Sequence, residues 1–333
     1  MYDTFRPVSP PPVASDGASA RADSTLTHPR LLWVVVMAES TDEQADRQSV
    51  GAVTDDGQLV TSGAGDRDAG RPWTLLGKLW AVVLAAVLGF GAILLPGLFV
   101  LPLVVATTLF SIELSLSPLA ELVINFVFGQ ILAMGGIAGL YLWATGKHHS
   151  YIRVRKPTLG ELLVITIAPF AVLFLIGGVN IFVSFFFNIE AASHSLLNFE
   201  GIEPTFYLLL IPFMILVVGP FEELLYRGVI QTRLTRSFSR PSAIVLASLI
   251  FVPIHLTAYS AGGANLMQVL AAFGALFAGS VLYGALYEWT ENLTVVAMAH
   301  GLTNSIQLLV VYIVTTNEEL QELANQATVL VGL

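Results

Sequence analysis

The stretch Thr205–Thr232 reads TFYLLLIPFMILVVGPFEELLYRGVIQT, a long apolar run with charged side chains in its second half. It is long enough to form a helix across a bilayer, which takes about 20 apolar residues. The charged residues are Glu222, Glu223 and Arg227. A charge near the centre of a bilayer costs about 2.5–3.5 kcal/mol on insertion scales, so ionisable residues inside a span are functional-site candidates by default.

The rest of the chain repeats the apolar pattern. Of its 333 residues 55% are hydrophobic and 12% are charged, whereas a soluble domain is about 25% charged. The first apolar run continues to Phe110 and contains Pro96 and Pro102, so a kinked span followed by a re-entrant piece would also fit it. Spans are predicted near 79–104, 117–144, 160–187, 205–232, 242–258, 266–288 and 292–314.

Seven or eight crossings of this length can satisfy their backbone polar groups in lipid only as helices. The predicted fold is therefore an all-α, polytopic transmembrane helical bundle over residues 76–316, with a short tail at 317–333.

Residues 1–75 differ from the rest of the chain. They are rich in Asp, Glu, Ser, Pro and Gly and carry much of the formal net charge of −9. Such a segment buries too little apolar surface to offset its ordering entropy, so we predict a disordered, acidic N-terminal region. Met37 is followed by AESTDEQADRQ, typical of a soluble N-terminus, and residues 1–36 are interpreted as a misassigned start.

Basic residues predict the orientation, because cytoplasmic loops carry an excess of Lys and Arg. If the spans alternate, all basic clusters fall on one side and most loop acids on the other, with the acidic turn EWTEN (Glu288–Asn292) as the exception. We therefore predict a multi-pass protein of the cell membrane with its N-terminus in the cytoplasm. The basic clusters are Arg67, Arg71 and Lys78; Lys147, Arg153, Arg155 and Lys156; and Arg233, Arg236 and Arg240.

The first intramembrane polar cluster divides into two parts. Glu223 and Arg227 are i,i+4 on a helix and face each other, so they can neutralise one another. Glu222 lies about 100° around the helix and has no obvious local partner. A carboxylate in that position suits a general base or acid. The alternative is a buried ion network that only holds the bundle together.

Two further spans carry polar residues. FVPIH (Phe251–His255) places His255 in apolar sequence beside Pro253, where a helix can kink. HGLTN places His300 and Asn304 on one helix face, a pair suited to stabilising an oxyanion. Taken singly, a packing histidine and interhelical hydrogen bonding explain them equally well.

The combination is more specific than its parts. The remaining histidines, His28, His148, His149 and His194, fall in polar stretches. The chain has no cysteine, which excludes a Cys nucleophile and thiolate metal sites. We therefore predict one converging Glu–His–His–Asn site.

This order and spacing resembles the CAAX protease and bacteriocin-processing family of intramembrane endopeptidases, which includes the Ras-converting type of CAAX prenyl endopeptidase. The resemblance covers residues 204–310, and the loop KHHSYIRVRKPTLGEL (Lys147–Leu162) is also similar. The matching residues are Glu222, Glu223 and Arg227 in GPFEELLYRG, Phe251 and His255 in FVPIH, and His300 and Asn304 in HGLTN.

The resemblance implies an endopeptidase in which Glu222 and His255 activate a water and His300 and Asn304 stabilise the oxyanion. Glu223, Arg227 and Phe251 would support the site. We expect no cofactor, because the histidines lack the HExxH arrangement of zinc proteases. The alternative is zinc held by Glu222, His255 and His300.

The expected partners are a peptide or lipidated protein substrate, such as a prenylated CAAX protein, and membrane lipids, with no nucleic acid. The sequence indicates no particular oligomeric state. Two non-enzymatic alternatives are a transporter that uses the intramembrane acids and histidines as a proton relay, and a membrane scaffold. The sequence shows no internal repeat of the kind common in transporters.

Overall fold

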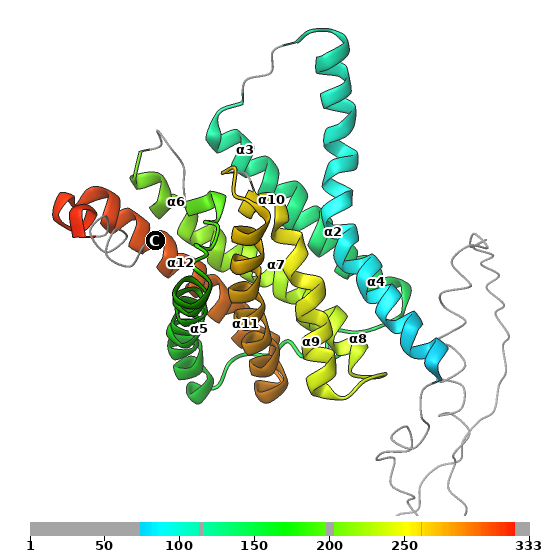
Figure 1. Ribbon diagram of the computed structural model, residues 1–333. Coiled ribbons are helices and arrows are strands. Elements are labelled where there is room, and N and C mark those ends of the chain that lie inside the picture. The colour runs from blue at the N-terminus through cyan, green and yellow to red at the C-terminus, as the bar shows by residue number, and fades with distance from the viewer. Residues whose placement is uncertain (1–73, 113–115, 198–202, 261, 324–333) are drawn as a thin grey trace, which may run out of the picture. The chain divides into compact units, whose positions relative to one another are not determined.

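The computed structural model describes residues 74–112, 116–197, 203–260 and 262–323, and Figure 1 shows their helices. Within these ranges all regular secondary structure is helical. The predictions for the N-terminal region 1–75 and its misassigned start at 1–36 lie outside the described residues, apart from the first helix, α2, which begins at Leu75. Most of the predicted tail at 317–333 also lies outside them.

Seven helices of the described chain are long and apolar enough to cross a membrane, which confirms the predicted all-α, multi-pass fold. Several of these spans are made of consecutive helical segments of different type, α-helical, π-helical or 3-10. The spans are α2 (Leu75–Leu109); α3 (Pro118–Ile124) with η2 (Asn125–Gly135) and α4 (Gly136–Ala144); α5 (Leu159–Phe187); α6 (Thr205–Phe213) with η4 (Met214–Val218), α7 (Gly219–Glu223), η5 (Leu224–Gln231) and α8 (Thr232–Leu234); α9 (Arg240–Phe251) with η6 (Val252–His255) and α10 (Leu256–Ser260); α11 (Leu266–Thr290); and α12 (Leu293–Thr316).

The first apolar run is a single helix. Helix α2 continues through Pro96 and Pro102, so the run counts as one crossing without a re-entrant piece. Proline removes a backbone donor and crowds the preceding turn, and Figure 1 shows α2 bending part-way along its length.

Side-chain caps set the ends of the helices. Thr158 accepts a hydrogen bond from the Glu161 backbone in a capping box at the start of α5, and Asn265 forms the same motif with Gln268 at the start of α11. Helix α5 ends at Asn188 in the left-handed conformation, with a φ of 52°. These caps satisfy backbone groups that would otherwise be orphaned at the helix ends.

Helices α11 and α12 form the centre of the bundle. Helix α11 packs between α5 and α9, and α12 packs against α5, α6 and α7 (Figure 1). Outward-facing side chains are large and apolar, with Phe174 85% and Phe185 80% exposed. Such a surface suits lipid rather than water, and it leaves the polar residues of the spans on the inner faces.

The acidic turn that departed from the orientation pattern is ion-paired. Glu288 lies 3.4 Å from Arg153 and 3.6 Å from Arg240, measured between carboxylate oxygen and guanidinium nitrogen. Gln231 donates to Glu288 at 3.1 Å and to the Gly284 carbonyl at 3.0 Å. The basic loops therefore neutralise this acid, which explains why it occurs at the basic end of the bundle.

Candidate functional site

Two glycines bring the fourth and seventh spans into backbone contact. A Cβ atom on Gly301 would lie 2.7 Å from backbone atoms of η4, and one on Gly219 would collide with the backbone of α12. Gly219 opens α7, the turn that carries Glu222, and Gly301 follows His300 on α12. Small residues allow helices in membranes to approach this closely. This crossing brings the carboxylates and the histidine together.

Glu223 is the centre of a buried polar cluster. Its Oε2 lies 3.1 Å from Nε of Arg227, the pair that helical spacing predicted. Its Oε1 lies 2.7 Å from Nδ1 of His300, a contact between positions 77 residues apart. The ring of His300 also stacks on that of Tyr283, with 5.1 Å between centroids. Glu223 and Tyr283 together fix the orientation of the imidazole.

Arg227 connects this cluster to two further helices. Its Nη2 donates to the carbonyl and hydroxyl oxygens of Ser280 on α11, at 3.2 and 3.1 Å. Its guanidinium carbon lies 4.9 Å from the ring centroid of Phe251 on α9, a distance at which a cation is attracted to an aromatic face. Arg227 thus contacts α9 and α11 as well as Glu223.

Glu222 makes contacts of its own beside the Glu223–Arg227 pair. Its Oε1 accepts a hydrogen bond from the Gln130 amide at 3.1 Å, and its Oε2 lies 3.8 Å from Nε2 of His300. Oε2 is buried and makes no hydrogen bond with any described group. Sequence reasoning missed Gln130; its amide in the apolar second span was a signal, but Asn125 in the same span gives the same signal.

His255 lies at the edge of the cluster. It ends the 3-10 turn η6, which contains Pro253 and continues into α10. The ring centroids of His255 and Phe251 are 4.8 Å apart, and those of Phe251 and His300 are 6.4 Å apart. Nδ1 of His255 is buried and has no hydrogen-bond partner among the described residues. Phe251 thus contacts His255 and lies near His300.

Asn304 follows His300 by one turn on α12 and is half-buried. Helical spacing places it on the same face of α12 as His300. The described contacts thus join only part of the predicted Glu–His–His–Asn site.

His194 is a histidine that the sequence placed in a polar stretch, yet it lies beside the site. It belongs to the α5–α6 connection, and its ring centroid is 6.3 Å from that of His255 and 5.1 Å from that of Tyr259. Burial lowers the pKa of His194 to about 4. The ring is therefore neutral near pH 7.

The donors proposed for zinc do not converge in the described part of the chain. No three His, Asp or Glu residues there are close enough together to hold a metal ion. Nδ1 of His300 contacts Glu223, and its Nε2 lies 3.8 Å from Oε2 of Glu222. Glu222, His255 and His300 therefore form no three-ligand group in the described part of the chain.

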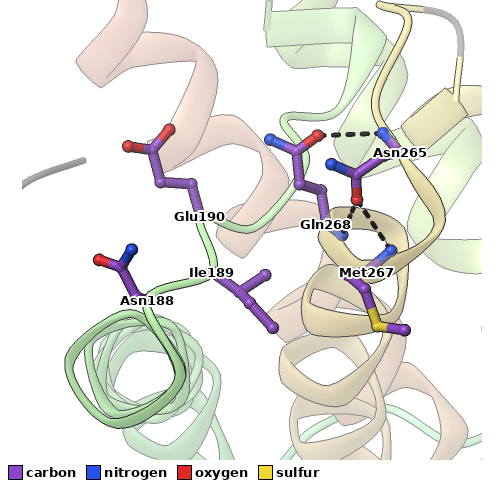
Figure 2. Close-up of a pocket in the computed structure, with 6 residues that line it drawn as sticks. All are labelled: Asn188, Ile189, Glu190, Asn265, Met267 and Gln268. Atoms are coloured by element: carbon purple, nitrogen blue, oxygen red, sulfur yellow. Dashed lines mark hydrogen bonds between the residues drawn. The ribbon is translucent and has the colours of Figure 1, made fainter.

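A separate pocket of about 220 Å³ lies between the end of α5 and the beginning of α11 (Figure 2). Asn265 and Gln268 contribute their polar atoms to the α11 capping box. None of the residues that line the pocket belongs to the buried cluster around Glu222 and Glu223. Its lining residues are Asn188, Ile189, Glu190, Asn265, Met267 and Gln268.

Comparison with known families identifies the segment that contains this cluster. Residues 204–306 match the family described as type II CAAX prenyl endopeptidase Rce1-like. This segment is an Rce1-like domain. The Rce1-like domain belongs to a family of proteases and contains all seven residues that the sequence singled out, whereas Gln130 and His194 lie outside it.

A curated relative extends the comparison to bacteria. The uncharacterized protein YpbD of Bacillus subtilis (strain 168) is 32% identical over 94 residues, which is 28% of this chain. The chain spans 41% of the length of that relative. No solved structure matches the chain.

Proposed function

We propose that this chain is an intramembrane endopeptidase that hydrolyses a peptide bond of a membrane-associated substrate with a water activated by Glu222. The observation that carries the proposal is the buried Oε2 of Glu222, which has no described hydrogen-bond partner and lies 3.8 Å from Nε2 of His300. A buried acceptor is costly unless something donates to it. A water bound there would be in place for general-base catalysis.

The charges of the cluster support this assignment. Glu222 and Glu223 carry two negative charges when ionised, and Arg227 balances one of them. An imidazolium at His300, hydrogen-bonded to Glu223 through Nδ1, would balance the other and present an Nε2–H donor. A neutral sum of charges is what a site buried within a membrane requires.

In the proposed reaction Glu222 takes a proton from the water while the water oxygen bonds to the substrate carbonyl carbon. Donors at His300 and Asn304 stabilise the resulting oxyanion. The C–N bond then breaks, and the proton held by Glu222 passes to the leaving nitrogen. His255, through its unpartnered Nδ1, contributes to holding the water. Glu223 and Arg227 orient His300 and the helix.

The match to a protease family supports a peptide or protein substrate, and we take a prenylated CAAX peptide as the first probe because the matching family is described as a CAAX prenyl endopeptidase. We favour a metal-free mechanism because the zinc donors do not converge among the described residues. The zinc-dependent form of the same protease is the alternative that a chelator tests.

The test compares wild type, Glu222→Gln and the control Glu318→Gln in proteoliposomes with a quenched-fluorescent prenylated CAAX peptide. Glu318 is an exposed acid beyond α12. We expect cleavage by wild type and by the control, loss of at least about 100-fold in Glu222→Gln, and no effect of a strong chelator. Activity retained by Glu222→Gln would overturn the general-base assignment. Activity lost with chelator and restored by zinc would establish the zinc form.

A further inference from the structure

The second span contributes a polar contact that lies outside the Rce1-like domain. Gln130 is half-buried on η2, and its Nε2 donates to Oε1 of Glu222 at 3.1 Å. The two residues are 92 positions apart. A carboxylate in apolar surroundings gains more from an N–H donor than it would in water.

The backbone of the second span is shaped for this contact. η2 is π-helical over Asn125–Gly135, and π-helical turns are rare and concentrated at functional sites. At the end of η2, a Cβ atom on Gly135 would lie 2.6 Å from the ring of Phe221, the residue before Glu222. The absence of a side chain at Gly135 therefore lets η2 pack directly on α7.

Each partner in this contact keeps one unused oxygen. Oε1 of Gln130 and Oε2 of Glu222 are buried and accept no hydrogen bond from any described group. Buried acceptors are nearly always satisfied, so these two oxygens indicate a donor that belongs to the working site, a water O–H or a peptide N–H. Gln130 thus engages one side of the carboxylate and leaves the other side to the reactants.

We propose that Gln130 is a positioning residue for Glu222. Its N–H holds Oε1 so that Oε2 faces the water and the substrate carbonyl. This inference rests on the proposed function, since it assigns Glu222 a particular orientation as the base. The other titratable or charged groups that face Glu222 are His300 from α12 and, from its own span, Glu223, Tyr226 and Arg227. Among the described hydrogen bonds, Gln130 is the one donor from η2 to this carboxylate.

The test measures kcat, KM and the pH profile of kcat in proteoliposomes for wild type, Gln130→Met, Gln130→Asn and the control Asn125→Ala. Methionine keeps the length of the side chain without a donor, and asparagine keeps the amide but withdraws it by one methylene. Asn125 is exposed and opens the same π-helix. Thermal unfolding in detergent shows which variants are folded.

We expect kcat to fall about 10- to 100-fold in both Gln130 variants, the range typical for a hydrogen bond to a charged group. KM should stay within about twofold, because the interaction acts on the base and not on substrate binding. The acidic limb of the kcat profile should move to higher pH by about one unit, since the carboxylate loses a donor that favours its charged form. Asn125→Ala should match wild type.

The outcomes separate this inference from the function on which it rests. A wild type without activity, or an active Glu222→Gln, would overturn both. If wild type is active and Glu222→Gln is not, unchanged kcat and pH profile in a folded Gln130→Met would overturn the positioning role alone. An increase in KM at constant kcat would also overturn it, since it would assign Gln130 to substrate binding. One Gln130 variant could lose activity because it no longer unfolds cooperatively, while the other stays folded with a normal pH profile of kcat. That result would make Gln130 a structural residue and would overturn the positioning role as well.

Discussion

Replacing Arg227 by methionine should destabilise the bundle through the charge that it leaves behind. The side chains of Arg227 and Glu223 are 1% and 0% exposed. Removing one partner of a buried ion pair costs about 3–5 kcal/mol, because the other charge remains without compensation. Glu223→Gln should cost a similar amount for the same reason. In Glu223→Gln with Arg227→Met no stranded charge remains, so the cost should be about 2 kcal/mol less than the sum of the single variants.

The assay is reversible unfolding in mixed micelles, followed by tryptophan fluorescence as SDS is titrated. The matched control is the Arg240–Glu291 pair, whose side chains are 66% and 59% exposed. Solvent screens such a pair, so the same cycle there should give a coupling below about 1 kcal/mol. The reasoning would be refuted if the cost of the double variant at Arg227 and Glu223 equalled the sum of the two single costs within about 0.5 kcal/mol, since independent sites behave in that way.

Three further predictions concern packing, an ion pair and a histidine. Gly301→Ala should abolish cleavage and lower the unfolding temperature, because its Cβ would lie 2.7 Å from rigid backbone; Gly139→Ala, which has open space around it, should resemble wild type in both measurements. Glu288→Gln should lower the free energy of unfolding in mixed micelles by about 1–3 kcal/mol through loss of its contact with Arg153, and an unchanged free energy would contradict that pairing. His194 has its pKa lowered by burial from 6.5 to about 4. Because the folded form binds the proton less well, stability should be complete above pH 6.5 and decline as pH falls toward 4, and the difference in unfolding free energy between wild type and His194→Asn should show that slope.

The spans could be predicted because hydrophobic length is a local property of the sequence. An apolar run that continues through Pro96 and Pro102 still forms one helix, since neighbouring turns of a long span tolerate proline. The Glu223–Arg227 pair was predictable in the same way, because helical spacing alone determines which side chains face each other.

The contacts between spans could not be predicted locally. The Glu223–His300 hydrogen bond depends on the crossing at Gly219 and Gly301, and a single sequence does not reveal which glycines meet. The contact of Gln130 depends in addition on π-helical turns, which have no clear signature in an apolar run. The acidic turn looked exceptional because its ion pairs join distant parts of the chain.

The ion pair within the fourth span also matters during synthesis of the protein. His300 is made 77 residues after Glu223, an interval of about 4–15 s at ordinary rates of translation. During that interval the fourth span has to enter the bilayer without its later partner. The local pairing of Glu223 with Arg227 halves the uncompensated acidity of the segment, so the span can be inserted before the helix that completes the site exists.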